Sequence, residues 1–284
     1  MTQIVYLNGS FCAASEAKLS IFDRSIQFAD SIYEVIPVYD GRLFRFSKHL
    51  KRLESSLSKV IMALPELDWL ALFNKLIEAN GGGDMQIYLQ ITRGSILGVR
   101  KLEIPSNIEP TVIAYTLNTP YPSLEAQKKG LRVELVEDLR WLRCDIKATA
   151  LLANVLLNDE AQAKGADTAI FVRDGFLIEG SASNLFLVDK KGRILTSPLN
   201  NFCLSGVTRL VVIELINSLS WTLCEEKIPK EAIFDAQEVW ITSTTKEIFP
   251  VTQVNEIIIG NGKAGSYWST INEKYKQLIK NTYD

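Results

Sequence analysis

The chain has 284 residues, of which 47% are hydrophobic and 23% charged, the proportions of a globular protein long enough for two packed domains. Its 31 basic and 33 acidic side chains give a net charge of -2, which offers no electrostatic reason to bind nucleic acid or an anionic membrane. No apolar run approaches the roughly 18 residues that a membrane span needs, and the N-terminus shows no export signal.

The chain offers little for chemistry that depends on metals, disulfides or histidine. His49 is its only histidine, and its four cysteines lie far apart with no CxxC spacing. A disulfide framework and a metal site are therefore not expected, and free thiols in a reducing cytoplasm are the simplest expectation. No Gly-x-Gly-x-x-Gly motif follows a strand and no Walker A motif is present, so nucleotide binding has no support either.

Strand and turn signals predict two domains. Runs rich in β-branched and aromatic residues are separated by turns such as Asp40-Gly41 and Asp174-Gly175, which is the pattern of β-hairpins. Two prolines and no periodicity in 117–124 mark a boundary, with a smaller domain over 1–120 and a larger one over 121–284. Because strands and helices come in blocks rather than in strict alternation, we predict an α/β (α+β) fold with largely antiparallel sheets.

The expected elements follow in chain order. In the first domain they are strands at 4–7, 31–39 and 42–46, a helix with Ser47 as its N-cap, a helix over 68–79, and strands at 85–93 and 111–116. In the second they are a strand at 131–136, a helix over 149–163, strands at 168–172, 176–179, 184–188 and 193–196, a helix over 207–219 and a strand over 238–242.

Lys147 precedes a predicted helix and could be a nucleophile. Its neighbours Leu142, Cys144 and Ile146 are apolar, and Arg140 adds positive charge nearby. Both features favour the uncharged amine, which can form a Schiff base. The alternative is an ordinary surface lysine at the start of a helix.

Four other segments point to an anionic ligand with a ring. Glu179 ends a strand before a turn of small residues, where a carboxylate could hold a proton on a ring nitrogen. Val207 and Thr208 open a helix, whose N-terminus favours an anion, and Thr244 lies in a hydroxyl-rich turn. Arg52 lies on a predicted helix. Each segment alone also has a purely structural interpretation: the end of a hairpin for Glu179, a helix cap for Val207 and Thr208, a polar turn for Thr244, and a solvated helix face for Arg52. Together with the lysine, the four segments fit the groups that pyridoxal phosphate requires.

On these residues the chain resembles the fold-type IV pyridoxal-phosphate enzymes of the class IV aminotransferase family, and most closely their D-amino acid aminotransferase branch. The resemblance is carried by residues 23–35 (DRSIQFADSIYEV), 49–53 (HLKRL), 140–147 (RWLRCDIK), 179–184 (EGSASN), 206–209 (GVTR) and 243–247 (STTKE). The block over 140–147 is the most specific for this branch, whereas the others are shared with branched-chain aminotransferases and aminodeoxychorismate lyases.

The resemblance implies two α/β subdomains with the cofactor between them, and a homodimer in which the partner subunit contributes to the substrate pocket. Lys147 would bind pyridoxal 5′-phosphate as a Schiff base and move the proton in catalysis, and Glu179 would pair with the pyridine nitrogen. The other contacts that it implies are those of Arg52, Val207, Thr208 and Thr244 with the phosphate, of Arg140 near the phenolic oxygen, and of Tyr33 on the substrate side.

Two positions depart from the branch. After Thr92-Arg93-Gly94 the branch has an arginine and, two residues later, a histidine that help to hold the substrate α-carboxylate, but this chain has Gly98 and Arg100 there. We expect Arg100 to take over, because a guanidinium can bind a carboxylate through two hydrogen bonds. Ala182 stands where a serine is usual, so one hydroxyl near the ring is missing.

The favoured function is transfer of the amino group of a D-amino acid, such as D-alanine, to a 2-oxo acid, such as 2-oxoglutarate, by a cytoplasmic homodimer that needs no metal. Two alternatives stay open. One is an aminodeoxychorismate lyase, which releases 4-aminobenzoate and pyruvate and gains weight from the altered carboxylate residues. The other is a branched-chain L-amino acid aminotransferase.

Overall fold

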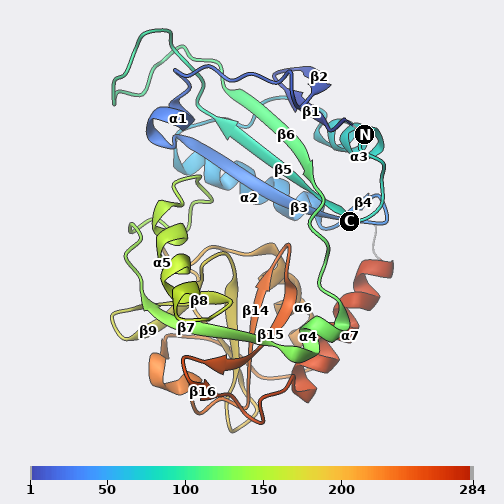
Figure 1. The fold of residues 1–284 in the computed structure, drawn as a ribbon, viewed down its shortest axis with the longest axis vertical. Helices are drawn as coiled ribbons and strands as arrows, with labels where there is room; N and C mark the ends of the chain where they lie inside the picture. The colour runs from blue at the N-terminus through green and yellow to red at the C-terminus, as the bar shows by residue number, and fades with distance from the viewer. Residues whose placement is uncertain (1, 282–284) are drawn as a thin grey trace. The chain divides into compact units, whose positions relative to one another are not determined.

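The computed structural model describes residues 2–281. The chain divides into two compact units, each with its own sheet and helices (Figure 1). Of the described residues, the first unit contains 2–120 and 146–150, and the second contains 121–145 and 151–281. The segment that carries Lys147 therefore belongs to the first unit, whereas the sequence analysis assigns it to the second domain.

The first unit is built on a six-stranded antiparallel sheet in the order β2-β1-β6-β5-β3-β4. Its strands are β1 (Ile4–Leu7), β2 (Ser10–Ala13), β3 (Ser31–Tyr39), β4 (Arg42–Leu43), β5 (Met85–Thr92) and β6 (Thr111–Leu117), and its helices are α1 (Arg24–Phe28), α2 (Phe46–Lys59) and α3 (Trp69–Ala79). Leu53 and Leu57 of α2 and Phe73 of α3 share a buried core with Ile36 and Leu89 of the sheet. This core fixes α2 against β3.

The helix α2 begins earlier than the sequence predicts. Its N-cap is Arg45, in the left-handed conformation with φ of 55°, and no side chain caps it, so Ser47 lies inside the helix. The chain turns from the short strand β4 directly into α2. His49 and Arg52, in the first two turns of α2, are thereby brought to Glu34 of β3.

The segment that carries Lys147 is extended and lies along β3. Tyr33 N donates to Lys147 O at 3.0 Å, and Thr149 N donates to Ser31 O at 3.1 Å. Ile32 and Ala148 also form an antiparallel bridge, so the chain around Lys147 pairs with β3 as an extended segment. The predicted helix therefore begins three residues later, as α5 (Leu152–Ala163).

The second unit is built on a ten-stranded mixed sheet in the order β12-β11-β10-β14-β15-β7-β8-β9-β13, with β16 paired to β15. Its strands are β7 (Leu131–Glu137), β8 (Thr168–Arg173), β9 (Phe176–Gly180), β10 (Asn184–Val188), β11 (Ile194–Thr196), β12 (Leu223–Glu225), β13 (Ile228–Pro229), β14 (Glu238–Ser243), β15 (Glu247–Val254) and β16 (Ile257–Ile258). Its helices are α4 (Leu124–Lys129), α5, α6 (Val207–Ser218) and α7 (Ser266–Asn281), with a 3-10 turn at Lys230–Ile233.

The two sheets differ in strand direction. The first is antiparallel throughout, as predicted, whereas in the second β15, β7 and β8 run parallel to one another, as do β11 and β12. A parallel pair needs a crossover, and α5 supplies it between β7 and β8. The predicted α/β (α+β) class is confirmed. The prediction of largely antiparallel sheets holds in full for the first sheet, whereas the second sheet is mixed.

Four segments of the second unit meet around the start of β10. Asn184, its first residue, pairs with Thr242 of β14. Glu179 lies near the end of β9, just before the turn that leads into β10. The helix α6 also begins here. Its N-cap Gly206 lies so close to Asn184 that a Cβ on the glycine would be only 2.0 Å from Asn184 Oδ1. The fold thus brings β9, β10, β14 and the N-terminus of α6 to one place.

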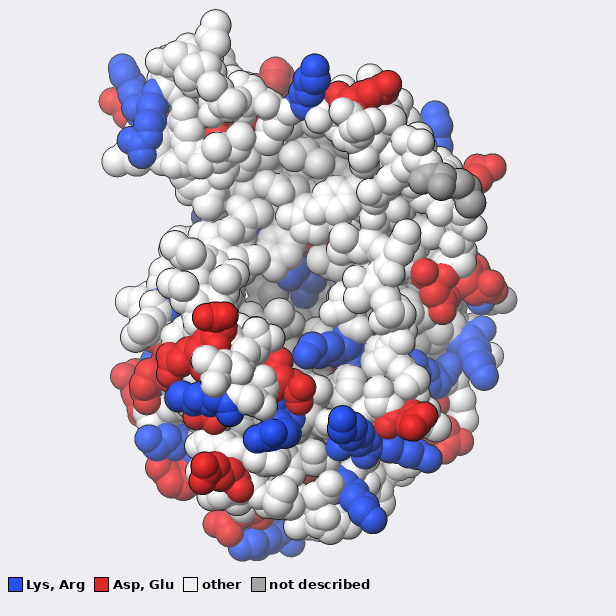
Figure 2. Space-filling model, viewed as in Figure 1, with Lys and Arg blue, Asp and Glu red and all other residues white. Residues whose placement is uncertain are grey.

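The charged surface agrees with the nearly balanced composition. Acidic and basic side chains are interspersed on the face of the second unit that Figure 2 shows. Such a surface does not resemble the one-sign patch that nucleic-acid binding requires. Among the helices of residues 2–281, none is long and apolar enough to cross a bilayer.

Candidate active site

In the first unit, Lys147 and Tyr33 lie in direct contact. Lys147 Nζ is 4.2 Å from the centroid of the Tyr33 ring. Tyr33 is in turn stacked on Tyr88, with ring centroids 5.8 Å apart. The backbone hydrogen bond between Tyr33 and Lys147 fixes the two residues side by side. The structure therefore brings together the predicted Schiff-base lysine and the predicted substrate-side tyrosine.

Arg52 lies close by, bound to a buried carboxylate. Its Nε donates to Glu34 Oε1 and its Nη2 to Glu34 Oε2, both at 2.7 Å, and His49 Nδ1 lies 2.8 Å from Oε2. Glu34 is fully buried. Burial alone would raise the pKa of Glu34, but the charge and hydrogen bonds of Arg52 and His49 outweigh it and lower the pKa to about 2. Glu34 is therefore ionised and holds the Arg52 guanidinium in one orientation.

Glu34 is not among the residues predicted from the sequence, although the sequence carries a signal for it. Ile32 and Ile36 lie two residues before and two residues after Glu34 on β3, and both isoleucines belong to the core. Strand periodicity therefore places a carboxylate on the apolar face of the sheet, where it needs a cationic partner. The partners of this carboxylate, His49 and Arg52, lie on α2, and only the folded structure shows that α2 packs beside Glu34. The chain's single histidine is thus engaged with Glu34.

In the second unit, Glu179 and Arg140 form a buried ion pair that extends to a second acid. Arg140 Nη1 donates to Glu179 Oε1 at 2.7 Å, while its Nε and Nη2 donate to Asp138 at 2.8 and 3.0 Å. Burial raises the pKa of Glu179, although Arg140 opposes this effect. The resemblance placed Arg140 near the cofactor's phenolic oxygen. In the structure its guanidinium joins Asp138 to Glu179.

The second oxygen of Glu179 is held from three sides. Leu204 N donates to Oε2 at 3.0 Å, Asn184 Nδ2 lies 3.2 Å from it, and Cys203 Sγ lies 3.7 Å from it. Sequence reasoning singled out neither Asn184 nor Cys203 for this role. Because both oxygens are engaged, the carboxylate has a fixed orientation.

The start of α6 and the turn after β14 offer groups that suit an anion. Gly206, the N-cap of α6, makes no side-chain capping bond. The first N–H groups of a helix, here those of Val207 and Thr208, have no acceptor within it, and they carry the positive end of the helix dipole. Thr244 lies in the turn between β14 and β15, where Lys246 N donates to Ser243 Oγ at 3.1 Å.

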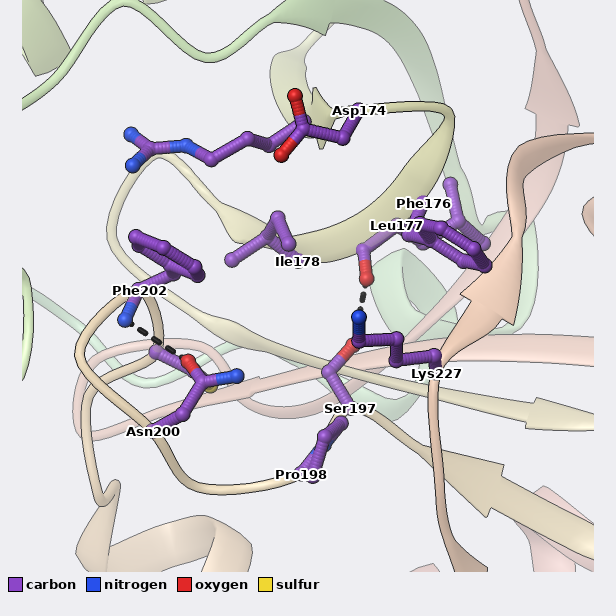
Figure 3. A pocket seen from close by; sticks show the side chains of 11 residues that line it. Asp174, Phe176, Leu177, Ile178, Ser197, Pro198, Asn200, Phe202 and Lys227 are labelled. Atoms are coloured by element: carbon purple, nitrogen blue, oxygen red, sulfur yellow. Dashed lines mark hydrogen bonds between the residues drawn. The ribbon is translucent and has the colours of Figure 1, made fainter. Parts of the chain in front are cut away.

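A small cavity lies next to this arrangement in the second unit. It has a volume of about 60 Å³, room for about two water molecules. It is lined by Leu177 and Ile178 of β9 and by Ser197 and Phe202 of the loop that follows β11 (Figure 3), and Ser197 Oγ donates to Leu177 O at 2.8 Å. Cys203, whose Sγ lies 3.7 Å from Glu179 Oε2, also lines it. Burial raises the pKa of this thiol above its ordinary value.

Arg100, the predicted carboxylate-binding residue, lies on an exposed loop of the first unit. Its guanidinium carbon is 5.0 Å from the centroid of the Phe28 ring, and that of Arg24 is 4.7 Å from the same ring. Arg24 Nη1 also donates to Lys101 O at 2.8 Å, which ties the loop to α1. Arg100 is therefore held against an aromatic ring with its side chain exposed.

The donors of each unit, taken separately, fit pyridoxal 5′-phosphate. In the second unit, Glu179 Oε1 has the capacity to accept a further hydrogen bond from a protonated ring nitrogen. The N-terminus of α6 and the Thr208 and Thr244 hydroxyls match a phosphate. In the first unit, Lys147 has the amine that an aldehyde requires and Arg52 a guanidinium suited to phosphate. Within residues 2–281, no cluster of His, Cys, Asp or Glu is placed to hold a metal ion.

Comparison with known proteins agrees with this donor set. A family model described as amino-transferase class IV matches residues 31–254. The D-alanine aminotransferase of Bacillus licheniformis is 37% identical over 263 residues, 92% of this chain and 92% of that protein. The D-alanine aminotransferase of Staphylococcus aureus strain N315 is 36% identical over 281 residues, 97% of this chain and 98% of that protein.

Solved structures show the same fold. The branched-chain amino acid aminotransferase of Escherichia coli matches with a TM-score of 0.90 at 23% identity, over 98% of this chain and 95% of that one. The branched-chain aminotransferase of the thermophilic archaeon Thermoproteus uzoniensis, solved with norvaline, matches with a TM-score of 0.87 at 25% identity, over 100% and 97%. These likenesses confirm the predicted fold-type IV architecture. The family model spans most of the chain, and the two relatives exceed a third in identity over nearly all of it, so the chain belongs to the class IV aminotransferase family.

Proposed function

We propose that this protein is a pyridoxal-phosphate-dependent D-amino acid aminotransferase, which moves the amino group of a D-amino acid such as D-alanine to a 2-oxo acid such as 2-oxoglutarate. The observation that carries the choice of a D-amino acid is the similarity to D-alanine aminotransferases at 36–37% identity over more than nine tenths of the chain. The structural likeness to branched-chain enzymes rests on lower identity and supports the fold alone.

The chain's residues divide the work of the reaction. The cofactor, when bound, supplies an electron sink for the substrate Cα. Lys147 binds the cofactor's aldehyde carbon and moves the proton at the substrate Cα, a role that its position over Tyr33 supports. Glu179 keeps the ring nitrogen protonated, and Arg140 keeps Glu179 in place. Tyr33 lies on the substrate side.

The phosphate is held by Arg52 together with the backbone of Val207 and the Thr208 and Thr244 hydroxyls. The fixed orientation that Glu34 gives the Arg52 guanidinium supports this role, because a preset guanidinium loses less freedom on binding an anion.

The substrate carboxylate is bound by Arg100. Its contact with the Phe28 ring supports this role, because a guanidinium held against a ring keeps its N–H groups available at its edge for a carboxylate. Gly98, two positions earlier, has no side chain, so of the two positions that depart from the branch only Arg100 carries a charge.

The protein acts as a homodimer in the cytoplasm. Large apolar side chains exposed on each unit support the dimer, because a dimer contact would remove them from water. On the second unit they are Leu139, Trp141, Leu142, Leu152, Val155 and Leu156, and on the loop of the first they are Leu97 and Leu102. All four cysteines are free thiols, which supports a reducing compartment.

A single-turnover absorbance experiment on the purified yellow protein tests the function. D-alanine, L-alanine and L-leucine are added separately with no oxo acid present. Loss of the visible cofactor band with D-alanine only is the expected result. Loss with L-leucine only would replace the proposal by a branched-chain L-amino acid aminotransferase. No change with any of the three, together with release of 4-aminobenzoate and pyruvate from aminodeoxychorismate, would replace it by the lyase.

A further inference from the structure

Asn184 contacts both the Glu179 carboxylate and the start of α6. It is the first residue of β10 and its side chain is 4% exposed. Its Nδ2 donates to Leu204 O at 2.8 Å and lies 3.2 Å from Glu179 Oε2. An amide nitrogen has two hydrogens, so one serves Leu204 and the other points to Glu179, with Cys203 Sγ 3.4 Å away.

The amide oxygen of Asn184 faces the other anchor. A Cβ on Gly206 would lie 2.0 Å from Asn184 Oδ1. The φ of Gly206 is −67°, which any residue adopts, so the requirement for glycine is one of space and not of backbone freedom. Asn184 is thus packed against the N-cap of α6, and its backbone pairs with Thr242, two residues before Thr244.

We infer that Asn184 is a positioning residue that fixes the separation between the ring-nitrogen carboxylate, Glu179, and the phosphate-binding N-terminus of α6. This inference rests on the proposed function. A rigid ligand whose ring nitrogen and phosphate are a set distance apart binds both anchors fully only where the protein holds them at that distance. Asn184 therefore acts on the joint binding of the two ends, and much less on either end alone.

Equilibrium binding to the cofactor-free protein separates these effects without any activity measurement. Three probes are compared, namely pyridoxal 5′-phosphate, pyridoxal and inorganic phosphate. In Asn184→Ala the affinity for pyridoxal 5′-phosphate should fall by about tenfold, while those for pyridoxal and for inorganic phosphate should each change less than about twofold. An equal loss for pyridoxal would overturn the inference and assign Asn184 to Glu179 alone. An equal loss for phosphate would overturn it by assigning Asn184 to α6 alone.

A second variant approaches the same contact from the other side. Gly206→Ala must displace Asn184, since the new methyl group would overlap its Oδ1. It should reproduce the pattern of Asn184→Ala, with the loss confined to the ligand that has both ends. This variant keeps the inference testable if Asn184→Ala does not fold. An unchanged affinity for pyridoxal 5′-phosphate in the folded variants would overturn it.

Asn272 provides a matched control. It is also 4% exposed, and it lies on α7, where its Nδ2 donates to Gln127 Oε1 at 3.3 Å. Asn272→Ala should leave all three affinities unchanged. If it lowered them as much as Asn184→Ala does, both effects would be due to general destabilisation of the protein, and the inference would be overturned. If the unaltered protein bound no pyridoxal 5′-phosphate, the proposed function itself would fail. Binding by the unaltered protein with no change in the variants refutes the role of Asn184 only.

Discussion

Replacement of Glu34 by glutamine should destabilise the first unit by about 3 kcal/mol at neutral pH. The pKa of Glu34 falls from 4.5 to about 2 in the folded protein, because Arg52 and His49 more than offset its burial. At about 1.4 kcal/mol for each pKa unit, this corresponds to about 3 kcal/mol of stability from the charged form. Glutamine removes the charge and turns an amide N–H group toward two donors, so the loss should be at least that large.

The pH dependence of this loss has a definite sign. A carboxyl group whose folded pKa is depressed contributes stability that is complete above its unfolded pKa and is lost as the pH falls through the folded value. The difference between the wild type and Glu34→Gln should therefore be constant above about pH 5.5 and fall by about half near pH 3.

Native-state hydrogen exchange of the β3 and α2 amides measures this difference within the first unit, since a chain with two units need not unfold in one step. Glu54→Gln is the matched control, because Glu54 lies on the same helix α2 but is exposed. Its replacement should change stability by less than about 0.5 kcal/mol. A loss below about 1 kcal/mol in Glu34→Gln, or a difference that does not shrink in acid, would refute the reasoning.

Three further variants test the roles of single side chains. Lys147→Ala should abolish amino transfer in the single-turnover assay while the phosphate contacts still retain some cofactor, and full activity would contradict its role. Arg100→Ala should lower kcat/KM for D-alanine by at least about tenfold, or about 1.4 kcal/mol of transition-state binding, and an unchanged value would show that it does not hold the substrate. Arg140→Met should raise the pKa of Glu179 further, because Arg140 opposes the effect of burial, and so move the acid limb of the kcat/KM profile to higher pH. An unmoved limb, or an equal shift in the control Arg143→Met, whose side chain is 42% exposed and pairs with Asp145 instead, would contradict this link.

The local elements followed well from the sequence where short-range signals determine them. The strand β10 has the bounds predicted for it, 184–188, and α6 begins at Val207 as predicted. The strand β15 and the helix α7 were not predicted. β15 is buried on both faces and so lacks a clear alternation, and besides its hairpin partner β14 it pairs with β7, which lies more than 100 residues earlier in the chain. Which strands pair across such distances is a property of the whole sheet.

The predicted site residues had sequence signals, but their partners mostly did not. Lys147 was expected at the start of a helix because the residues after it have good helix propensity, yet its backbone pairs with β3, more than 100 residues earlier in the chain. Arg140 was recognised by resemblance, but its bonds to Asp138 and Glu179 depend on β7 and β9 lying on either side of β8. Local patterns identify reactive side chains, whereas their charge environment comes from long-range pairing.

Glu34 and Glu179 show how that environment separates two carboxylates with similar burial. Glu34 receives two hydrogen bonds from Arg52 and a third from His49, and its pKa falls. Glu179 receives a single bond from Arg140, whose other donors bond to Asp138 and to Phe202 O. The negative charge of Asp138 adds to the burial that raises the pKa of Glu179. A low pKa suits a carboxylate that only has to hold an arginine. A buried carboxylate whose charge is only partly balanced gains from a further cationic partner, and a protonated ring nitrogen would supply one. Asp138 therefore acts on Glu179 in two ways, through its own negative charge and by binding the arginine that would otherwise balance Glu179 alone.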